Sequence, residues 1–183
     1  MFVALAAVAF ALLSPRAQRA VNELVLPLRY ENIIRQQARE KGLDPALIAA
    51  VIFAESHFRE GRTSSAGAQG LMQITPATAA DIARRSGGSA FQVQDLHTPQ
   101  VNISYGAYHL RFLLRHYGGN VGLAVAAYNA GPTNVDRWLV EAASEGRPLT
   151  VQAIPFPETR AYVAKVKKAR GDYRREYRRE LGL

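Results

Sequence analysis

Apolar residues recur three and four positions apart through most of the chain, and residues that form turns separate these stretches. This spacing is typical of helices that bury one face, and no segment shows the alternation of apolar and polar residues that marks a strand. Proline opens several of the segments and glycine closes them, as expected at the two ends of a helix. The pattern predicts helices from Arg29 to Gly42, from Asp44-Pro45, from Thr75-Pro76 to Arg85, from Thr98-Pro99 to Gly118-Gly119, over Val121 to Asn129, around Trp138 and Leu139, and from Glu158 onward. The sequence therefore predicts an all-α fold without internal repeats.

One predicted helix carries an acidic residue inside an almost unbroken apolar run. Glu55 lies in the stretch LIAAVIFAESHF, about three turns after the helix start at Asp44-Pro45, and it aligns with Val51 and Ile52 on the apolar face. An ionised carboxylate on a buried face is costly unless it is paired. Two interpretations stand. Glu55 is an acid at a helix end that reaches water or pairs with an arginine, or its apolar surroundings raise its pKa so that it donates a proton near neutral pH.

Composition narrows the class of protein. A chain of 183 residues, of which 48% are hydrophobic, is long enough for one well-packed domain and too short for two large ones. The absence of cysteine excludes disulfide frameworks, thiolate metal sites and cysteine nucleophiles. His97, His109 and His116 show no spacing typical of metal ligands, so we expect neither a metal nor another cofactor.

The charge of the chain favours an acidic partner. The net charge is +8, and nine of the 23 basic residues lie between Arg160 and Arg179. Nucleic acid, anionic lipid and an anionic cell-wall polymer are all compatible with this excess. A solvated charged face on a terminal helix explains the basic run better than a specific nucleic-acid surface does.

The N-terminus begins with an apolar run from Met1 to Leu13 that ends at Ser14-Pro15. Its length suits the apolar region of a signal peptide better than the span of a full bilayer, but no Lys or Arg precedes it and no small-residue cleavage site follows it. We expect residues 1–20 to be an export signal or membrane anchor and residues 21–183 to form the catalytic domain with its basic C-terminal helix. The alternative is a buried N-terminal helix.

Four short motifs follow one another along the predicted domain: AESHF, the Gly-rich loop GAQGLMQ, AYNAG and PFPETRAYV. Each alone has a structural explanation, such as a tight turn or a helix cap. In this order and spacing they resemble the lytic transglycosylases of the soluble-lytic-transglycosylase (SLT) catalytic domain, which are relatives of goose-type lysozyme. The segment DLHTPQVNISYGAYHLRFLL adds to the resemblance, which runs from Tyr30 to about Tyr162. It implies a lysozyme-like helical domain with a deep substrate groove.

The resemblance also implies a reaction and roles for individual residues. Glu55 would protonate the glycosidic oxygen between N-acetylmuramic acid and N-acetylglucosamine in peptidoglycan. Its carboxylate would then take the proton of the muramoyl 6-hydroxyl, which attacks C1 and leaves a 1,6-anhydromuramoyl end. One residue in both roles agrees with the lack of a second carboxylate in any of the motifs. Six residues would line the groove or contact the sugar: Ser56, Gln69, Met72, Gln73, Tyr128 and Asn129. Tyr162 would help to orient the Glu55 carboxyl group at the substrate site, and Glu158 would support it.

Other functions stay open on the sequence alone. A hydrolytic muramidase with the same fold would release reducing muramic acid, and a non-catalytic module would bind the cell wall without cutting it. A nucleic-acid binder rests only on the basic C-terminus. We expect a monomer that acts on peptidoglycan glycan strands in the cell envelope, tethered to the membrane, with no nucleic-acid partner.

Overall fold

The computed structural model describes residues 23–87 and 90–183, and the regular structure in these ranges is helical apart from isolated bridges in the Gly-rich loop. The all-α prediction is confirmed. The helices are α3 (Glu31–Lys41), α4 (Pro45–Ser56), α5 (Pro76–Ser86), η1 (Val93–His97), α6 (Pro99–His116), α7 (Val121–Ala130), α8 (Pro132–Ser144), η2 (Val151–Ala153), α9 (Pro157–Glu176) and α10 (Arg178–Leu181).

The predicted helix ends are confirmed where the sequence carries capping residues. The carboxylate of Asp44 accepts a hydrogen bond from the backbone N–H of Ala46 at 3.0 Å. Helix α4 begins at Pro45, directly after Asp44. Thr75 caps α5 in the same way through Thr78. Gly42 ends α3 with a φ of 60°, a left-handed conformation that glycine adopts without strain.

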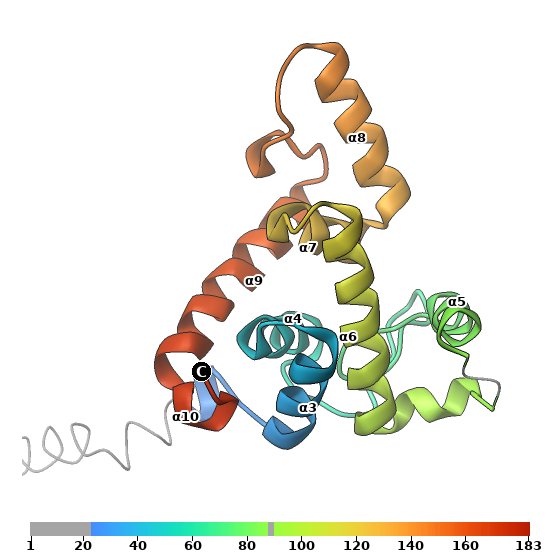
Figure 1. The fold of residues 1–183 in the computed structure, drawn as a ribbon, viewed down its shortest axis with the longest axis vertical. Helices are drawn as coiled ribbons and strands as arrows, with labels where there is room; N and C mark the ends of the chain where they lie inside the picture. Colours follow the sequence, from blue (N-terminus) through green and yellow to red (C-terminus); the bar gives the residue numbers. More distant parts are fainter. Residues whose placement is uncertain (1–22, 88–89) are drawn as a thin grey trace, which may run out of the picture.

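Helix α4 lies in the middle of the helical body, beside α3 and α9 (Figure 1). The sequence predicts an apolar stripe on this helix, but the structure buries every residue from Ala46 to Ile52. A helix that is apolar on all sides is satisfied only when neighbours surround it. Glu55, in the last turn of this helix, is only partly buried.

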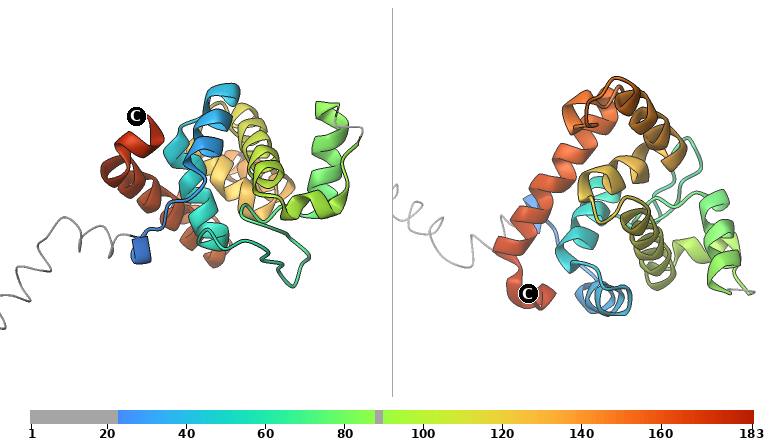
Figure 2. Two further views of the ribbon diagram at one scale, coloured as in Figure 1. Left: turned by 90° about the horizontal axis from the view of Figure 1, so that it is seen from below. Right: turned by 45° about the horizontal axis from the view of Figure 1, so that its top comes forward.

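The other helices build the frame around α4. Helix α9 packs against α4 and α7, and α6 packs against α3 and α7. Helix α5 lies to one side of the body after the Gly-rich loop (Figures 1 and 2), and α8 projects beyond α7 at the top of Figure 1. The ring of Trp138 on α8 meets that of Phe156 at 4.9 Å, edge to face, just before α9 begins.

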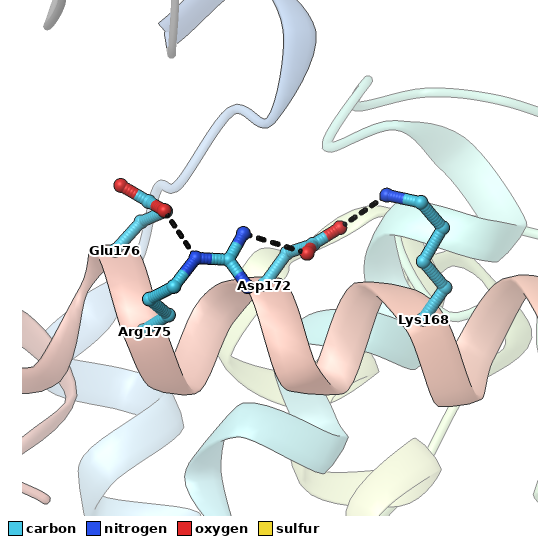
Figure 3. Close-up of polar contacts among 4 residues, drawn as sticks. All are labelled: Lys168, Asp172, Arg175 and Glu176. Atoms are coloured by element: carbon cyan, nitrogen blue, oxygen red, sulfur yellow. Dashed lines mark hydrogen bonds and ion pairs between the residues drawn. The ribbon is translucent and has the colours of Figure 1, made fainter.

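The basic C-terminal run lies mostly on α9, where ion pairs link part of it to acids. Lys168 and Arg175 both contact Asp172, at 2.7 and 2.9 Å, and Arg175 also contacts Glu176 (Figure 3). Exposed pairs of this kind stabilise little, about 0–1 kcal/mol each. They agree with a solvated charged face on this helix.

The predicted export segment, Met1 to Leu13, lies outside the described residues. Within residues 23–87 and 90–183, no helix has both the length and the hydropathy that crossing a bilayer requires.

Candidate active site

The centre of the site is the carboxyl group of Glu55 in the last turn of α4. The hydroxyl of Tyr162, on α9, donates a hydrogen bond to Glu55 Oε1 at 2.6 Å. Burial raises the pKa of Glu55 from 4.5 to about 7, because the ionised form loses water. The Tyr162 hydrogen bond and the positive charges of Arg62 and Lys165 oppose this rise in pKa.

The two interpretations of Glu55 can now be compared. No basic side chain among the described residues lies within 4.0 Å of its carboxylate, so a structural ion pair does not explain it. Its direct partner is a tyrosine, which donates a hydrogen bond without neutralising charge. A carboxyl group with a pKa near 7 exists in both protonation states at neutral pH, which a residue that gives and then accepts a proton requires.

Tyr162 itself is held in its protonated form. Burial raises its pKa well above the usual value, and the negative charge of Glu55 adds to the effect. The hydroxyl therefore remains a donor over the working pH range. Glu158 precedes Tyr162 by four residues, but it is exposed, and no hydrogen bond or ion pair joins it to Glu55 or Tyr162. Its predicted supporting role remains a prediction.

The Gly-rich loop, residues 61–74, is fastened to α6 by one buried amide. Asn102 Oδ1 accepts from the backbone N–H of Met72 at 2.7 Å, and its Nδ2 donates to the carbonyls of Gln69 and Leu96, both at 2.9 Å. Gly70 has a φ of 76°, and a Cβ on it would lie 2.2 Å from Asn102 Nδ2. The loop therefore needs glycine at this position.

Asn102 was not among the residues predicted for the site. The segment DLHTPQVNISYG contributed to the family resemblance, but a single asparagine within a helix gives no local sign of its partner. The signal that could have found it is a polar residue on the apolar face of α6, one turn before Gly106 and next to Ile103, because buried amides need partners.

Two residues predicted to contact the sugar lie beneath the surface instead. Ser56 is fully buried, and its hydroxyl donates toward the carbonyls of Leu71 at 2.8 Å and Ile52 at 3.1 Å. Met72 is also fully buried, and a Cβ added at Gly106 would lie 2.3 Å from its sulfur. Because neither side chain has exposed surface, we reassign both from contacting the sugar to holding the loop beside α4.

The pair Tyr128-Asn129 ends helix α7 beside the loop. The Tyr128 hydroxyl donates to the carbonyl of Met72 at 2.9 Å, so it positions the loop. Its pKa is raised well above the usual value by burial and by the nearby charge of Glu55. Asn129 is exposed, and its Oδ1 accepts from the hydroxyl of Thr159 at 2.8 Å. Its Nδ2 forms no hydrogen bond with the described residues and can donate to a ligand.

The two predicted glutamines of the loop differ in their surroundings. Gln73 has a φ of 49°, and its Nε2 donates to the carbonyls of Gly70 at 2.8 Å and Arg62 at 3.0 Å. The Oε1 of Gln69 is buried and lacks a partner among the described residues. The structure therefore uses Gln73 to shape the loop, while the predicted contact of Gln69 with the sugar remains a prediction.

Lys165 is a further residue that the sequence did not single out. Its Nζ donates to the carbonyl of Ala54 at 3.0 Å and lies 5.4 Å from the centre of the Phe53 ring. A cation beside the last carbonyls of α4 is favourable there. It also brings positive charge next to Glu55, one turn after Tyr162 on α9.

The site combines a single carboxyl group with a pKa near neutrality, a tyrosine that donates to it, and a loop fastened beside it. Together these features define a class of acid–base site on a helical domain. Residues 32–149 match the family described as Transglycosylase SLT domain. The chain belongs to this family.

Similar proteins carry the same domain within longer chains. The soluble lytic murein transglycosylase of Salmonella typhimurium is 35% identical over 147 residues, which cover 76% of this chain and 22% of that protein. The membrane-bound lytic murein transglycosylase C of Mannheimia succiniciproducens is 31% identical over 168 residues, covering 80% and 47%. The chain thus spans less than half the length of these curated relatives.

Solved structures agree on the fold. The 70 kDa soluble lytic transglycosylase of Escherichia coli superposes with a TM-score of 0.77 at 33% identity, over 83% of this chain and 25% of that one. An inactive mutant of the lytic transglycosylase Slt from Pseudomonas aeruginosa gives 0.76 at 34% identity, over 85% and 25%. The predicted lysozyme-like SLT fold is confirmed.

Proposed function

We propose that this domain cleaves the glycan strands of peptidoglycan as a lytic transglycosylase, with Glu55 as its single acid and base. The observation that carries the proposal is the Glu55–Tyr162 hydrogen bond on a carboxyl group whose pKa is raised to about 7. Relatives named lytic murein transglycosylases support the choice of substrate.

In the first step, protonated Glu55 gives its proton to the glycosidic oxygen, and the bond from that oxygen to C1 of the muramoyl residue breaks. Positive charge develops on the sugar as negative charge appears on Glu55. The Tyr162 hydroxyl stabilises the new carboxylate, and the charges of Arg62 and Lys165 act in the same direction. These groups make the carboxyl a usable acid although it is poorly solvated.

In the second step, the Glu55 carboxylate takes the proton of the muramoyl 6-hydroxyl. The oxygen of that hydroxyl forms a bond to C1 of the same muramoyl residue. The product carries a 1,6-anhydro ring, Glu55 is protonated again, and no water is consumed. A second carboxylate is not needed for this sequence. The carboxylate of Asp81, for example, pairs with Arg84 and Arg85 on the surface of α5.

Asn129 is the residue that we expect to meet the sugar directly. Its side chain is exposed, and its amide Nδ2 has no partner among the described residues. The carbonyl of an N-acetyl group offers an acceptor for this donor. The Oε1 of Gln69 is buried, so the predicted contact of Gln69 with the sugar remains a prediction.

Digestion of purified peptidoglycan tests the proposal. The wild-type domain should release anhydromuramoyl fragments, each lighter by one water than the corresponding lysozyme product, as measured by mass spectrometry. Glu55→Gln should release none while its circular dichroism stays native. Products with reducing ends only would assign the domain as a hydrolase. Binding without any cleavage by the wild type would indicate the non-catalytic module.

We further propose that the domain works outside the cytoplasmic membrane, because its polymer lies there. The apolar segment from Met1 to Leu13 would carry it across and could tether it. A relative named as a membrane-bound transglycosylase supports tethering.

A further inference from the structure

Helix α4 ends one residue after Glu55, and the next two residues leave the helical conformation. His57 and Phe58 have φ angles of 52° and 59°, in the left-handed region that glycine favours. The backbone hydrogen bond that closes the helix runs from the N–H of His57 to the carbonyl of Phe53 at 3.1 Å. A left-handed conformation costs free energy for a residue other than glycine, so neighbouring groups must hold this turn.

The carbonyl of Ala54 is the next one along the helix, and a side chain satisfies it. In a helix that continued past Ser56, this carbonyl would accept from the backbone N–H of Phe58, four residues further on. In the structure it accepts from Lys165 Nζ, on α9, at 3.0 Å. Lysine side chains near the C-terminus of a helix can bind its last carbonyls in this way. Lys165 therefore occupies the carbonyl that a continued helix would use.

Helix α9 reaches both ends of α4. At the start of α4, Asp44 Oδ2 accepts from Arg170 Nε at 2.6 Å and from Arg174 Nη1 at 2.7 Å. At its end, Tyr162 and Lys165 bind consecutive residues, the first through a carboxylate and the second through a backbone carbonyl. The two helices thus run in opposite directions, and these contacts tie them together at both ends.

Aromatic rings pack around the same turn. Lys165 Nζ lies 5.4 Å from the centre of the Phe53 ring. The centre of that ring lies 4.6 Å from the centre of the His57 ring and 6.2 Å from that of Tyr173. Phe58 is buried, and its ring centre lies 6.2 Å from that of Tyr173. Helix α9 thus holds the turn by ring contacts and by one hydrogen bond to the backbone.

We propose that Lys165 is a positioning residue: its ammonium group ends α4 after Glu55 and thereby holds the carboxyl group where Tyr162 donates to it. The inference rests on the proposed function, since it takes Glu55 as the acid and base. Without the ammonium group, the carbonyl of Ala54 lacks its partner, and the left-handed turn relaxes toward the helical conformation. The carboxyl group then moves relative to the reacting atoms, and a misplacement of about 1 Å can lower a rate about a hundredfold.

Kinetics of the full-length protein on soluble glycan strands test the inference. Lys165→Met keeps the length of the side chain but removes the donor, so kcat should fall roughly ten- to a hundredfold while KM stays within about twofold. Lys165→Arg retains a donor and a positive charge, so it should recover most of kcat. As a matched control, Lys167→Met removes the same charge from an exposed position of α9 and should change neither constant.

A second substitution separates the hydrogen bond from the charge. His57→Gly alone should leave kcat near the wild-type value, because this side chain is exposed and glycine adopts a left-handed φ without strain. Added to Lys165→Met, it should raise kcat by about fivefold or more, since the turn then needs less support while the charge is still missing. No recovery in the double variant would assign the effect to charge and overturn the inference. So would an unchanged kcat in Lys165→Met, or an equal loss in Lys167→Met.

The conformation of the turn is measured without substrate. Backbone NMR couplings and chemical shifts of His57 and Phe58 report the sign of φ, and they should lose their left-handed signature in Lys165→Met. A turn that stays left-handed in this variant would overturn the inference. Failure of the wild type to form anhydromuramoyl ends would overturn the proposed function alone, because the NMR measurement does not depend on cleavage and still decides whether Lys165 holds the turn.

Discussion

The substitution Glu55→Gln should change how the stability of the domain depends on pH. Glutamine has nearly the same shape as glutamate and can still accept the hydrogen bond of Tyr162, but it cannot ionise. Burial raises the pKa of Glu55 from 4.5 to about 7 in the folded domain. At about 1.4 kcal/mol for each pKa unit, this difference corresponds to about 3 kcal/mol, an order-of-magnitude figure.

The sign follows from proton binding. Below pH 4.5 the carboxyl group is protonated in both the folded and the unfolded state, so ionisation of Glu55 does not lower the free energy of unfolding relative to the Glu55→Gln variant. Between pH 4.5 and about 7 the unfolded chain releases the proton while the folded domain retains it, and wild-type stability falls relative to the variant. Above about pH 7 the deficit is complete and constant. Glu55→Gln should therefore match the wild type at acid pH and exceed its free energy of unfolding by about 3 kcal/mol at alkaline pH.

Urea unfolding of both proteins at about pH 4 and pH 8 measures this difference, because the titration of all other groups is common to both. Ser56→Ala provides the control. It removes a buried hydroxyl that donates to the carbonyl of Leu71, so it should destabilise by about 1 kcal/mol at both pH values. Wild-type and Glu55→Gln stabilities that run parallel from acid to alkaline pH would refute a raised pKa, and with it the argument that Glu55 is a proton donor at neutral pH.

Tyr162→Phe should shift the alkaline limb of the pH–activity profile to higher pH by roughly one unit, because the hydrogen bond that is lost favours the Glu55 carboxylate. The clearing of turbid cell-wall suspensions, followed across pH, measures this shift. A limb that stays in place or moves to lower pH would contradict the role of Tyr162 as a donor to Glu55. Asn102→Ala should lower the free energy of unfolding by about 2–3 kcal/mol, since the backbone N–H of Met72 and two carbonyls lose a buried partner. Denaturant titration measures this loss, and a change within about 0.5 kcal/mol would show that the loop does not depend on the amide.

Much of the fold could be predicted because its signals are local. Asp44 and Thr75 cap the helices that follow them, and Gly42 ends the first predicted helix, since each of these effects involves only the nearest turn of backbone. The position of the candidate catalytic acid, Glu55, could also be predicted. A charged residue stands out in an apolar run without reference to any other part of the chain.

The tertiary structure alone decided what surrounds that acid. Tyr162 lies 107 residues from Glu55 along the chain, and the motif that contains it predicts a role but not a hydrogen bond of 2.6 Å. The roles of Ser56 and Met72 changed for the same reason. Both stand in motifs typical of a binding site, yet whether a side chain faces solvent or core depends on which element packs over it.

The same distinction explains the residues that the sequence did not reveal. Asn102 and Lys165 lie in segments that read as ordinary helix, and each acquires its role from a backbone carbonyl or amide brought to it by another element. The sequence by itself determined the helices, their ends and the identity of the acid, because capping and hydrophobic periodicity act within one or two turns. The packing of α4 against α9 decided the pKa of that acid, because burial and hydrogen bonding depend on groups that meet only in the folded chain.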